Sequence, residues 1–556
     1  MPTRRVCVAG RAPGTSSRLP AAAPMKLRRL ETGSGMSNLL GINSTMIPVT
    51  SATSIPEGPG FRLQMAARHP NVILIVADDM GYGDFGCFSD GTVRTPHLDR
   101  LVAEGTCFRQ HYSASPICAP ARAALLTGRY PHRTGAITQH EIHGLDRIAL
   151  REVTLADAFH SAGYATSLVG KWHNGTFDRR FEPNARGFDE FTGFCGGWTD
   201  YYRYHLRRND SIAPSDGTYL TDLLTNEAED FVRRHPNDPF FLYLPYSAPH
   251  SPFQARDEWI APYRERGLNR IVATTYAMIE RMDAGIGRIL DTVHEAGLAE
   301  NTVVAFTSDN GPAFFNPPYM LEAGEPTFNE RYNSGLRGSK GWIYEGGIRV
   351  PMVLRWPGHV PGGCFADELA HFTDWMPTLL SLVDVKRPPG PPLDGCDLAP
   401  LLAGRSVSAE PRQFWQWNFY WPDIGTNAAM RDGTWKLVRP MIRGTRFFSD
   451  ELCVSDEDRA RTAAFVEADI KHKENPASVR AALPVPNLKP QQPEPPELYD
   501  LSSDPGEQRD VASQHPDRVR RMLASLQGWF EDVERDRKSI DQQDSCVPDA
   551  GHTSLD

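Results

Sequence analysis

The sequence predicts an α/β fold: a large, mostly parallel sheet sandwiched by helices, followed by a smaller C-terminal α+β domain built on an antiparallel sheet. Short apolar, β-branched runs alternate with helical segments over residues 66–400, as in a parallel sheet buried on both faces. Polar side chains follow four of these runs directly. A proline- and glycine-rich boundary at 388–412 precedes segments with hairpin-type turns.

Each predicted strand is a short apolar run. The first, Asn71–Ala77, reads NVILIVA and ends at two aspartates. The other expected strands of the large sheet are 164–169, 239–246, 302–307 and 348–354. The expected helices are 96–104, 270–296 and 373–383, with 518–534 closing the C-terminal domain. We interpret 466–496 as a long surface loop because it is rich in proline and lysine.

The chain is long enough for two domains, with 556 residues. Residues 1–64 have no sustained periodicity, and we expect them to be a disordered or mis-annotated N-terminal extension. Met36, Met46 and Met65 are alternative starts. The remaining regions are expected to be a large domain at 66–400, a C-terminal subdomain at 405–540 and a tail at 541–556.

Composition excludes several classes of function. The net charge of −10 argues against a general binder of nucleic acid or acidic membranes. The sequence contains no run of 18 or more apolar residues, so it predicts no membrane span. The N-terminus is basic, but no apolar signal-peptide core follows it, so the sequence favours the cytoplasm while leaving the compartment open. Nine scattered cysteines form neither a disulfide framework nor a zinc pattern.

Acidic and amide side chains follow two predicted strands, at the edge where ligands bind in open α/β sheets. Asp78 and Asp79 follow the first strand, and Asp309 and Asn310 follow 302–307. These oxygen donors suit Ca²⁺ or Mg²⁺ and disfavour zinc. An Asp-Asp pair alone is more typical of a turn or helix cap, but its combination with the second strand end favours a metal site. We interpret Asp84 as a turn residue and not as a ligand.

The segment 118–129, CAPARAALLTGR, contains a cysteine before a strong helix-forming run. Pro120 suits the first helical turn, and Gly128 suits the C-cap. Cys118 would then lie at a helix N-terminus, with Arg122 one turn further on. The segment resembles the signature of type I sulfatases, C-x-P-x-R-x-x-x-x-T-G-R, whose fold is alkaline phosphatase-like. That resemblance implies conversion of Cys118 to formylglycine (3-oxoalanine) by a transiently bound formylglycine-generating enzyme.

Further motifs resemble the same family, in its order and over roughly residues 69–535. They are GKWH at 170–173, APHSP at 248–252, RGSK at 337–340, GGIRVP at 346–351 and LYDLSSDPGE at 498–507. The family element usually continues as GKWHLG, whereas this chain has Asn174-Gly175. The last motif reads as structural, a strand and turn.

The resemblance assigns a role to each candidate site residue. Formylglycine hydrates, and one hydroxyl attacks sulfur in line. His250 contacts the leaving oxygen and His173 removes the proton that releases sulfate. The groups that stabilise the sulfate oxygens are Arg122, Lys171, Lys340 and the cation. The implied metal ligands are Asp78, Asp79, Cys118, Asp309 and Asn310, and the implied cation is Ca²⁺, with Mg²⁺ as the alternative.

The expected activity is therefore hydrolysis of a small aryl or carbohydrate sulfate monoester. One alternative is a formylglycine-dependent phosphonate monoester or phosphodiester hydrolase, since these share the fold and nucleophile. The other is a non-catalytic binder of sulfated ligands, if Cys118 stays a thiol. The aromatic segments at 198–202 and 415–421 could stack on a substrate ring or pack between the domains. The sequence identifies neither the substrate nor the oligomeric state.

Overall fold

The computed structural model describes residues 69–89, 91–314, 330–405, 412–442, 453–479, 482–489 and 492–540. The expected N-terminal extension at 1–64 and the tail at 541–556 lie outside these ranges. In the described residues, no helix combines the length and apolarity needed to cross a membrane.

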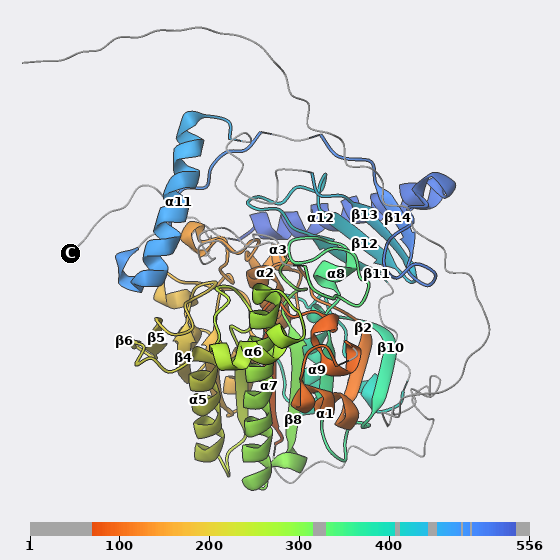
Figure 1. Ribbon diagram of the computed structural model, residues 1–556. Helices are drawn as coiled ribbons and strands as arrows, with labels where there is room; N and C mark the ends of the chain where they lie inside the picture. The colour runs from red at the N-terminus through yellow and green to blue at the C-terminus, as the bar shows by residue number, and fades with distance from the viewer. Residues whose placement is uncertain are drawn as a thin grey trace, which may run out of the picture. The chain divides into compact units, whose positions relative to one another are not determined.

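Ten strands of the described chain form one large sheet, in the order β10-β2-β9-β8-β1-β7-β3-β4-β5-β6 (Figure 1). The central pairs β8/β1, β1/β7, β7/β3 and β3/β4 are parallel. This confirms the predicted fold class. The strands are β1 Asn71–Ala77, β2 Thr106–Tyr112, β3 Ala165–Lys171, β4 Glu190–Phe194, β5 His205–Arg208, β6 Ser211–Pro214, β7 Phe240–Pro245, β8 Thr302–Ser308, β9 Met352–Arg355 and β10 Cys364–His371.

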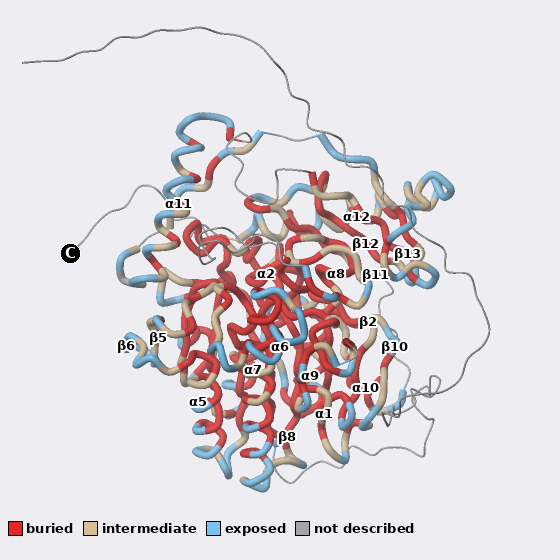
Figure 2. Tube along the Cα trace, in the orientation of Figure 1, coloured by how far each residue is buried: buried red, intermediate tan, exposed pale blue. Residues whose placement is uncertain are grey.

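Helices cover both faces of this sheet because successive side chains of its strands point to opposite sides. Leu74 of β1 packs in one apolar cluster with α2, α4, α9 and α10, and Ile73 packs in the other with α1, α5, α6 and α7. The central strands β1, β7 and β8 are buried along their length, whereas β6 at the sheet edge is exposed (Figure 2). The helices are α1 Pro96–Glu104, α2 Cys118–Thr127, α3 Pro131–Thr134, α4 Leu155–Ser161, α5 Leu220–Arg234, α6 Asp257–Glu265, α7 Arg270–Glu295, α8 Glu345–Ile348, α9 Trp375–Leu382 and α10 Ala399–Leu402.

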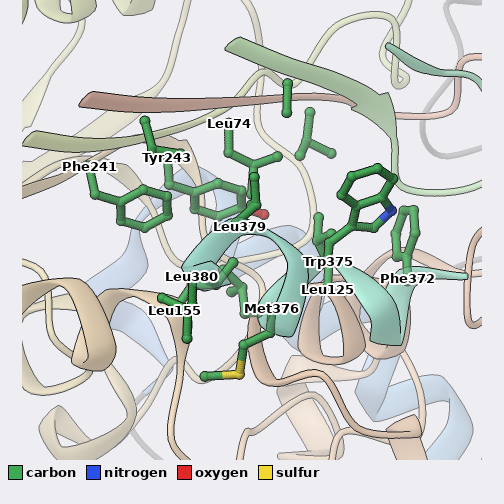
Figure 3. Packing of buried hydrophobic residues seen from close by; sticks show 14 of the residues in the cluster. Leu74, Leu125, Leu155, Phe241, Tyr243, Phe372, Trp375, Met376, Leu379 and Leu380 are labelled. Carbon is green, nitrogen blue, oxygen red and sulfur yellow. The ribbon is translucent and has the colours of Figure 1, made fainter. Parts of the chain in front are cut away.

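The first apolar layer fixes the helix that carries Cys118. Leu125 of α2 lies beside Trp375 and Met376 of α9, and Leu74 of β1 lies above the same layer (Figure 3). Every residue of α2 is buried, including Arg122. A fully buried helix cannot be displaced without opening a cavity in the core, so the start of α2 is held rigidly against the sheet.

A second sheet of four antiparallel strands follows, in the order β11-β12-β13-β14. Helix α12 packs on one side of it through Met522 and Leu526. On the other side, Trp415 Nε1 donates a hydrogen bond to the Ser113 carbonyl, 2.7 Å away, at the end of β2. The elements are β11 Arg412–Gln416, β12 Ala428–Asp432, β13 Trp435–Arg439, β14 Glu497–Asp500, α11 Asp456–Glu474 and α12 Pro516–Lys538.

Two sequence-based predictions were wrong. The segment predicted as a strand at 348–354 begins as the end of α8, and β9 starts at Met352. The loop predicted at 466–496 is partly helical, because α11 extends to Glu474. Ser455 caps α11 by accepting from the Asp458 N–H, but the largely exposed helix lacks the apolar stripe by which helices are recognised. The division into domains at 66–400 and 405–540 stays a prediction.

Candidate active site

Cys118 occupies the first turn of α2 in a fully buried position. Ile117 before it is extended, and Gly128 ends the helix with φ at 69°, as the motif predicts. Burial raises the pKa of the Cys118 thiol to about 12. The unmodified side chain is therefore a neutral thiol at physiological pH and a poor nucleophile.

Two neighbouring strands deliver four oxygen-bearing side chains beside Cys118. Because β1 and β8 are parallel, with Ala77 opposite Ser308, both chains leave the sheet at the same edge. The Asp79 N–H donates to Asp309 Oδ1 at 3.2 Å, and Asn310 Nδ2 donates to Asp79 Oδ1 at 2.7 Å. Both strand ends therefore contribute to one polar cluster, with Asp78 fully buried in it.

Three cations face the three carboxylates of this cluster. Arg122 donates to Asp309 Oδ2 through Nε at 2.9 Å and Nη2 at 2.7 Å. Lys171 Nζ lies 2.7 Å from Asp78 Oδ2, and Lys340 Nζ lies 2.7 Å from Asp79 Oδ1. With all six groups ionised, the formal charge of the cluster is zero.

The two central carboxyls respond differently to burial. Burial raises the pKa of both, but for Asp309 the attraction of Arg122, Lys171 and Lys340 outweighs it and lowers the pKa to about 2. For Asp78, burial wins over Lys171 and raises the pKa to about 7. The Asp78 carboxylate is thus the less stabilised of the two by the protein alone.

The donor set fits a divalent cation. Ligand atoms of Asp78, Asp79, Cys118 and His250 all lie within 4.8 Å of one another. Asp78 Oδ1 and Asn310 Oδ1 are buried and accept no hydrogen bond. Such acceptors are costly to bury without a partner, and a cation would satisfy both. Cys118 Sγ stands where an oxygen of formylglycine would lie, which would leave oxygen as the main donor type.

Two histidines complete the constellation. His250 Nδ1 lies 2.6 Å from the Ser251 carbonyl, so it carries a proton and leaves Nε2 to face Asp79 Oδ2 at 3.7 Å. His173 has a left-handed backbone with φ at 54° and is buried at the end of β3. Burial lowers the pKa of His173 to about 4, so its imidazole is neutral at physiological pH.

Comparison with known proteins accounts for this geometry. The family model for sulfatases matches residues 70–385, and a second model, N-sulphoglucosamine sulphohydrolase, C-terminal, matches residues 338–448. The chain belongs to the sulfatase family. It is a sulfuric ester hydrolase that acts on sulfate monoesters.

Curated relatives and solved structures of similar sequence agree. The sulfatase is 32% identical to N-acetylgalactosamine-6-sulfatase of Canis lupus familiaris, covering 68% of this chain and 79% of the relative. It is 30% identical to steryl-sulfatase of Mus musculus, covering 86% and 83%. The crystal structure of Ps i-CgsB in complex with k-i-k-neocarrahexaose aligns with a TM-score of 0.66 at 28% identity, over 86% of this chain and 96% of that one.

The structure brings the predicted site residues other than His173 into one cluster, and His173 follows two positions after Lys171 of that cluster. Asp84 lies apart from the cluster: it bonds the Gly81 N–H and the Arg331 guanidinium. Sequence reasoning missed Glu141, whose Oε2 lies 3.4 Å from His173 Nε2. No motif marks Glu141, because its role depends on a contact across 32 residues of chain.

The aromatic segments of this sulfatase serve two purposes. Trp415 and Trp417 are buried where the small sheet meets the large domain, so they pack and do not face solvent. Trp198 instead lines a cavity of about 250 Å³. The cavity also has polar walls, contributed by Thr176, Thr199, His205, Arg207, His472 and Lys473.

Proposed function

We propose that this sulfatase hydrolyses carbohydrate sulfate esters, using formylglycine made from Cys118 and one Ca²⁺ ion. The observation that carries the proposal is the buried cluster of three carboxylates and three cations around Cys118, in which Asp78 Oδ1 and Asn310 Oδ1 have no donor. A cluster of zero formal charge with unpaired oxygens has the composition expected of a site that binds a metal cation together with a sulfate anion.

The ion would be held by the side-chain oxygens of Asp78, Asp79, Asp309 and Asn310, with residue 118. Carboxylate and amide oxygens favour Ca²⁺ over zinc. Mg²⁺ is usually held by only one or two protein carboxylates, so a site with four or more protein ligands favours Ca²⁺ over Mg²⁺. Bound there, the ion would lower the pKa of a formylglycine hydroxyl and offset charge on the sulfate. It would also change the formal charge of the cluster from zero to +2, which suits a sulfate monoester anion.

The chain's own cations would bind and orient the ester. Arg122, Lys171 and Lys340 converge on the carboxylates next to residue 118, where they can hold the sulfate oxygens that gain charge during transfer. His250 keeps its own proton on Nδ1 toward Ser251, so Nε2 is the free nitrogen that faces the site; after taking up a second proton there, the ring would pass it from Nε2 to the leaving alcohol. His173, a neutral imidazole, would take the proton whose removal releases sulfate.

Two observations support a carbohydrate as the leaving group. The relatives include a protein named for N-acetylgalactosamine 6-sulfate and a structure in complex with neocarrahexaose. The cavity beside Trp198 combines an aromatic ring with hydroxyl and imidazole groups, the combination that recognises sugars.

The first test is the mass of the peptide that contains residue 118, from protein made in its own host or with a maturation enzyme. Conversion of the cysteine removes about 18 Da, a difference set by the covalent change. Rates on a sulfated sugar, an aryl sulfate and a phosphonate ester then separate the substrate classes. An unmodified Cys118 in active protein would overturn the formylglycine proposal, and a preference for the phosphonate ester would favour the phosphonate hydrolase.

A further inference from the structure

The imidazole of His173 is held at one nitrogen only. His173 Nε2 lies 2.9 Å from the Gln139 carbonyl oxygen and 3.4 Å from Glu141 Oε2. Both neighbours are acceptors, so Nε2 carries the proton of the neutral ring. His173 Nδ1 is buried and has no hydrogen-bond partner. Nδ1 therefore keeps the free lone pair that a base needs.

Glu141 is itself held by α11, a helix outside the large sheet. Lys473 Nζ forms an ion pair with Glu141 Oε1, and the Gly197 N–H donates to the same oxygen at 3.0 Å. The Lys473 side chain is only 7% exposed and also lies 3.5 Å from Asp469. Asp469 in turn accepts from Trp198 Nε1 at 3.1 Å. The chain of contacts runs from α11 through Glu141 to His173.

Two glycines allow this close packing. A Cβ at Gly197 would lie 2.7 Å from His173 Cε1, and a Cβ at Gly196 would lie 2.5 Å from Lys473 Nζ. Neither position has room for a side chain unless its neighbour moves. The Gly196-Gly197 pair therefore lets the backbone pass between the imidazole and the lysine, with one residue against each.

We propose that Glu141 and Lys473 are positioning residues for His173, holding its ring in place with the proton on Nε2 and the lone pair on Nδ1. This inference rests on the proposed role of His173 as the base that releases sulfate. It makes α11, whose Lys473 is 332 positions from Glu141, a part of the active-site support. Neither residue touches the ester sulfate in this scheme.

Charge supports the arrangement. Burial would raise the pKa of Glu141, but Lys473 and His173 outweigh it and lower the pKa well below its usual value. Glu141 is thus a carboxylate, a stronger acceptor for the Nε2 proton than a neutral acid. Lys473 compensates that buried charge, which would otherwise be costly.

The kinetic test uses Glu141→Gln and Lys473→Met, which keep side-chain size but remove charge. With p-nitrophenyl sulfate as substrate, we expect kcat of Glu141→Gln to fall about 10- to 100-fold, the range seen when the carboxylate that orients a functional histidine is removed. KM should not rise. Nitrophenol should appear in a stoichiometric burst before slow turnover, because its release precedes the proton transfer to His173. Lys471→Met is the matched control, since Lys471 is an exposed lysine of the same helix.

A double-mutant cycle tests the chain of contacts. If Lys473 acts through Glu141, the double variant loses little more kcat than Glu141→Gln alone. Simple multiplication of the two losses, or a rise in KM without loss of kcat, would overturn the proposal.

A second measurement does not depend on sulfatase activity. In ¹⁵N-histidine-labelled protein with unconverted Cys118, we expect the His173 ring, assigned with His173→Gln, to carry its proton on Nε2. Glu141→Gln and Lys473→Met should shift or broaden this signal, and Lys471→Met should not. An unchanged signal in both folded variants contradicts the positioning role. If instead the wild-type protein has no sulfatase activity but the signal responds, the proposed function fails and the positioning survives.

Discussion

Two buried clusters of charge in this molecule differ in how completely the protein satisfies them. In the first, around Cys118, Asp78 Oδ1 and Asn310 Oδ1 are buried without a hydrogen bond. In the second, where the small sheet meets the large domain, Lys436 Nζ lies 2.9 Å from both Glu345 Oε1 and Glu507 Oε1. We therefore propose the first cluster as a ligand site and the second as a structural one.

The second cluster is closed by further donors. Tyr112 donates to Glu345 Oε2 at 2.6 Å, and the Glu345 N–H donates to Glu507 Oε2 at 2.6 Å. Three of the four carboxylate oxygens therefore accept a hydrogen bond, and the fourth, Glu507 Oε1, accepts none but is paired with Lys436 Nζ at 2.9 Å. Buried charge by itself does not indicate function; the first cluster differs because its unpartnered oxygens, Asp78 Oδ1 and Asn310 Oδ1, lie in the same group of side chains as Cys118 and His250.

Removing the nucleophile of the first cluster should have the largest effect. In Cys118→Ser, a sulfated serine has no second hydroxyl on the same carbon to expel sulfate. We expect steady-state turnover to fall by about 10³-fold or more. Single-turnover and steady-state rates on an aryl sulfate measure this loss. Steady-state turnover near the wild-type rate would contradict the formylglycine mechanism.

Breaking the second cluster should affect stability and leave the chemistry intact. Lys436→Met leaves Glu345 and Glu507 buried without their cation, and we expect the free energy of unfolding to fall by about 3–5 kcal/mol. Urea denaturation measures it. Arg520→Met is the control, because the exposed Arg520–Asp517 pair should contribute less than about 1 kcal/mol. Equal losses of unfolding free energy in the two variants would contradict the structural role of the Lys436 cluster.

Calcium should stabilise the first cluster only. At 100 times its dissociation constant, a ligand that binds only the folded state adds about 2.7 kcal/mol of stability. We expect added Ca²⁺ to raise the melting temperature of wild type and of Lys436→Met, but not of Asp78→Asn. Calorimetry with and without a chelator measures it. A calcium response that survives in Asp78→Asn would place the ion elsewhere.

A further effect, on the pH dependence of stability, concerns a third buried carboxyl, Asp283, whose oxygens accept from the His97 and Leu98 N–H groups at 3.1 and 2.7 Å. Burial raises its pKa from 3.8 to about 7. Between those values the folded state holds a proton that the unfolded state has lost. This group therefore makes stability fall as pH rises from 4 to 7, by at most about 1.4 kcal/mol per pH unit.

Asp283→Asn should remove that slope and leave the calcium response unchanged. Urea denaturation at several pH values, with the wild type measured in parallel, provides the comparison. Identical pH profiles for the two proteins would show that Asp283 does not titrate in this range.

Much of the large sheet and of the helices that cover it was predictable, because the signals for these elements are local. The run Asn71–Ala77 and the helix Pro96–Glu104 have the bounds that the sequence predicts. Apolar runs of strand length and a proline at a helix start determine structure within a few residues. Helix α11 escaped this reasoning, because its exposed surface leaves no apolar stripe to detect.

The candidate site divides in the same way. Cys118, Asp78 and Asp309 were recognisable because each stands in a motif or directly after an apolar strand. Glu141 and Lys473 were not, since their chemistry depends on a contact between residues 332 positions apart. The Lys436 cluster was missed for the same reason.

The sequence by itself determined most strands and helices of the large sheet's layers, the family and the candidate site residues that stand in motifs. Only the tertiary structure decided which buried charged groups have hydrogen-bond or ion-pair partners, because those partners are the neighbours that packing brings to each group. Parallel pairing of β1 and β8 brings Asp78 and Asp309 to one edge. The docking of α11 brings Lys473 to Glu141, and no local pattern in either segment records that contact.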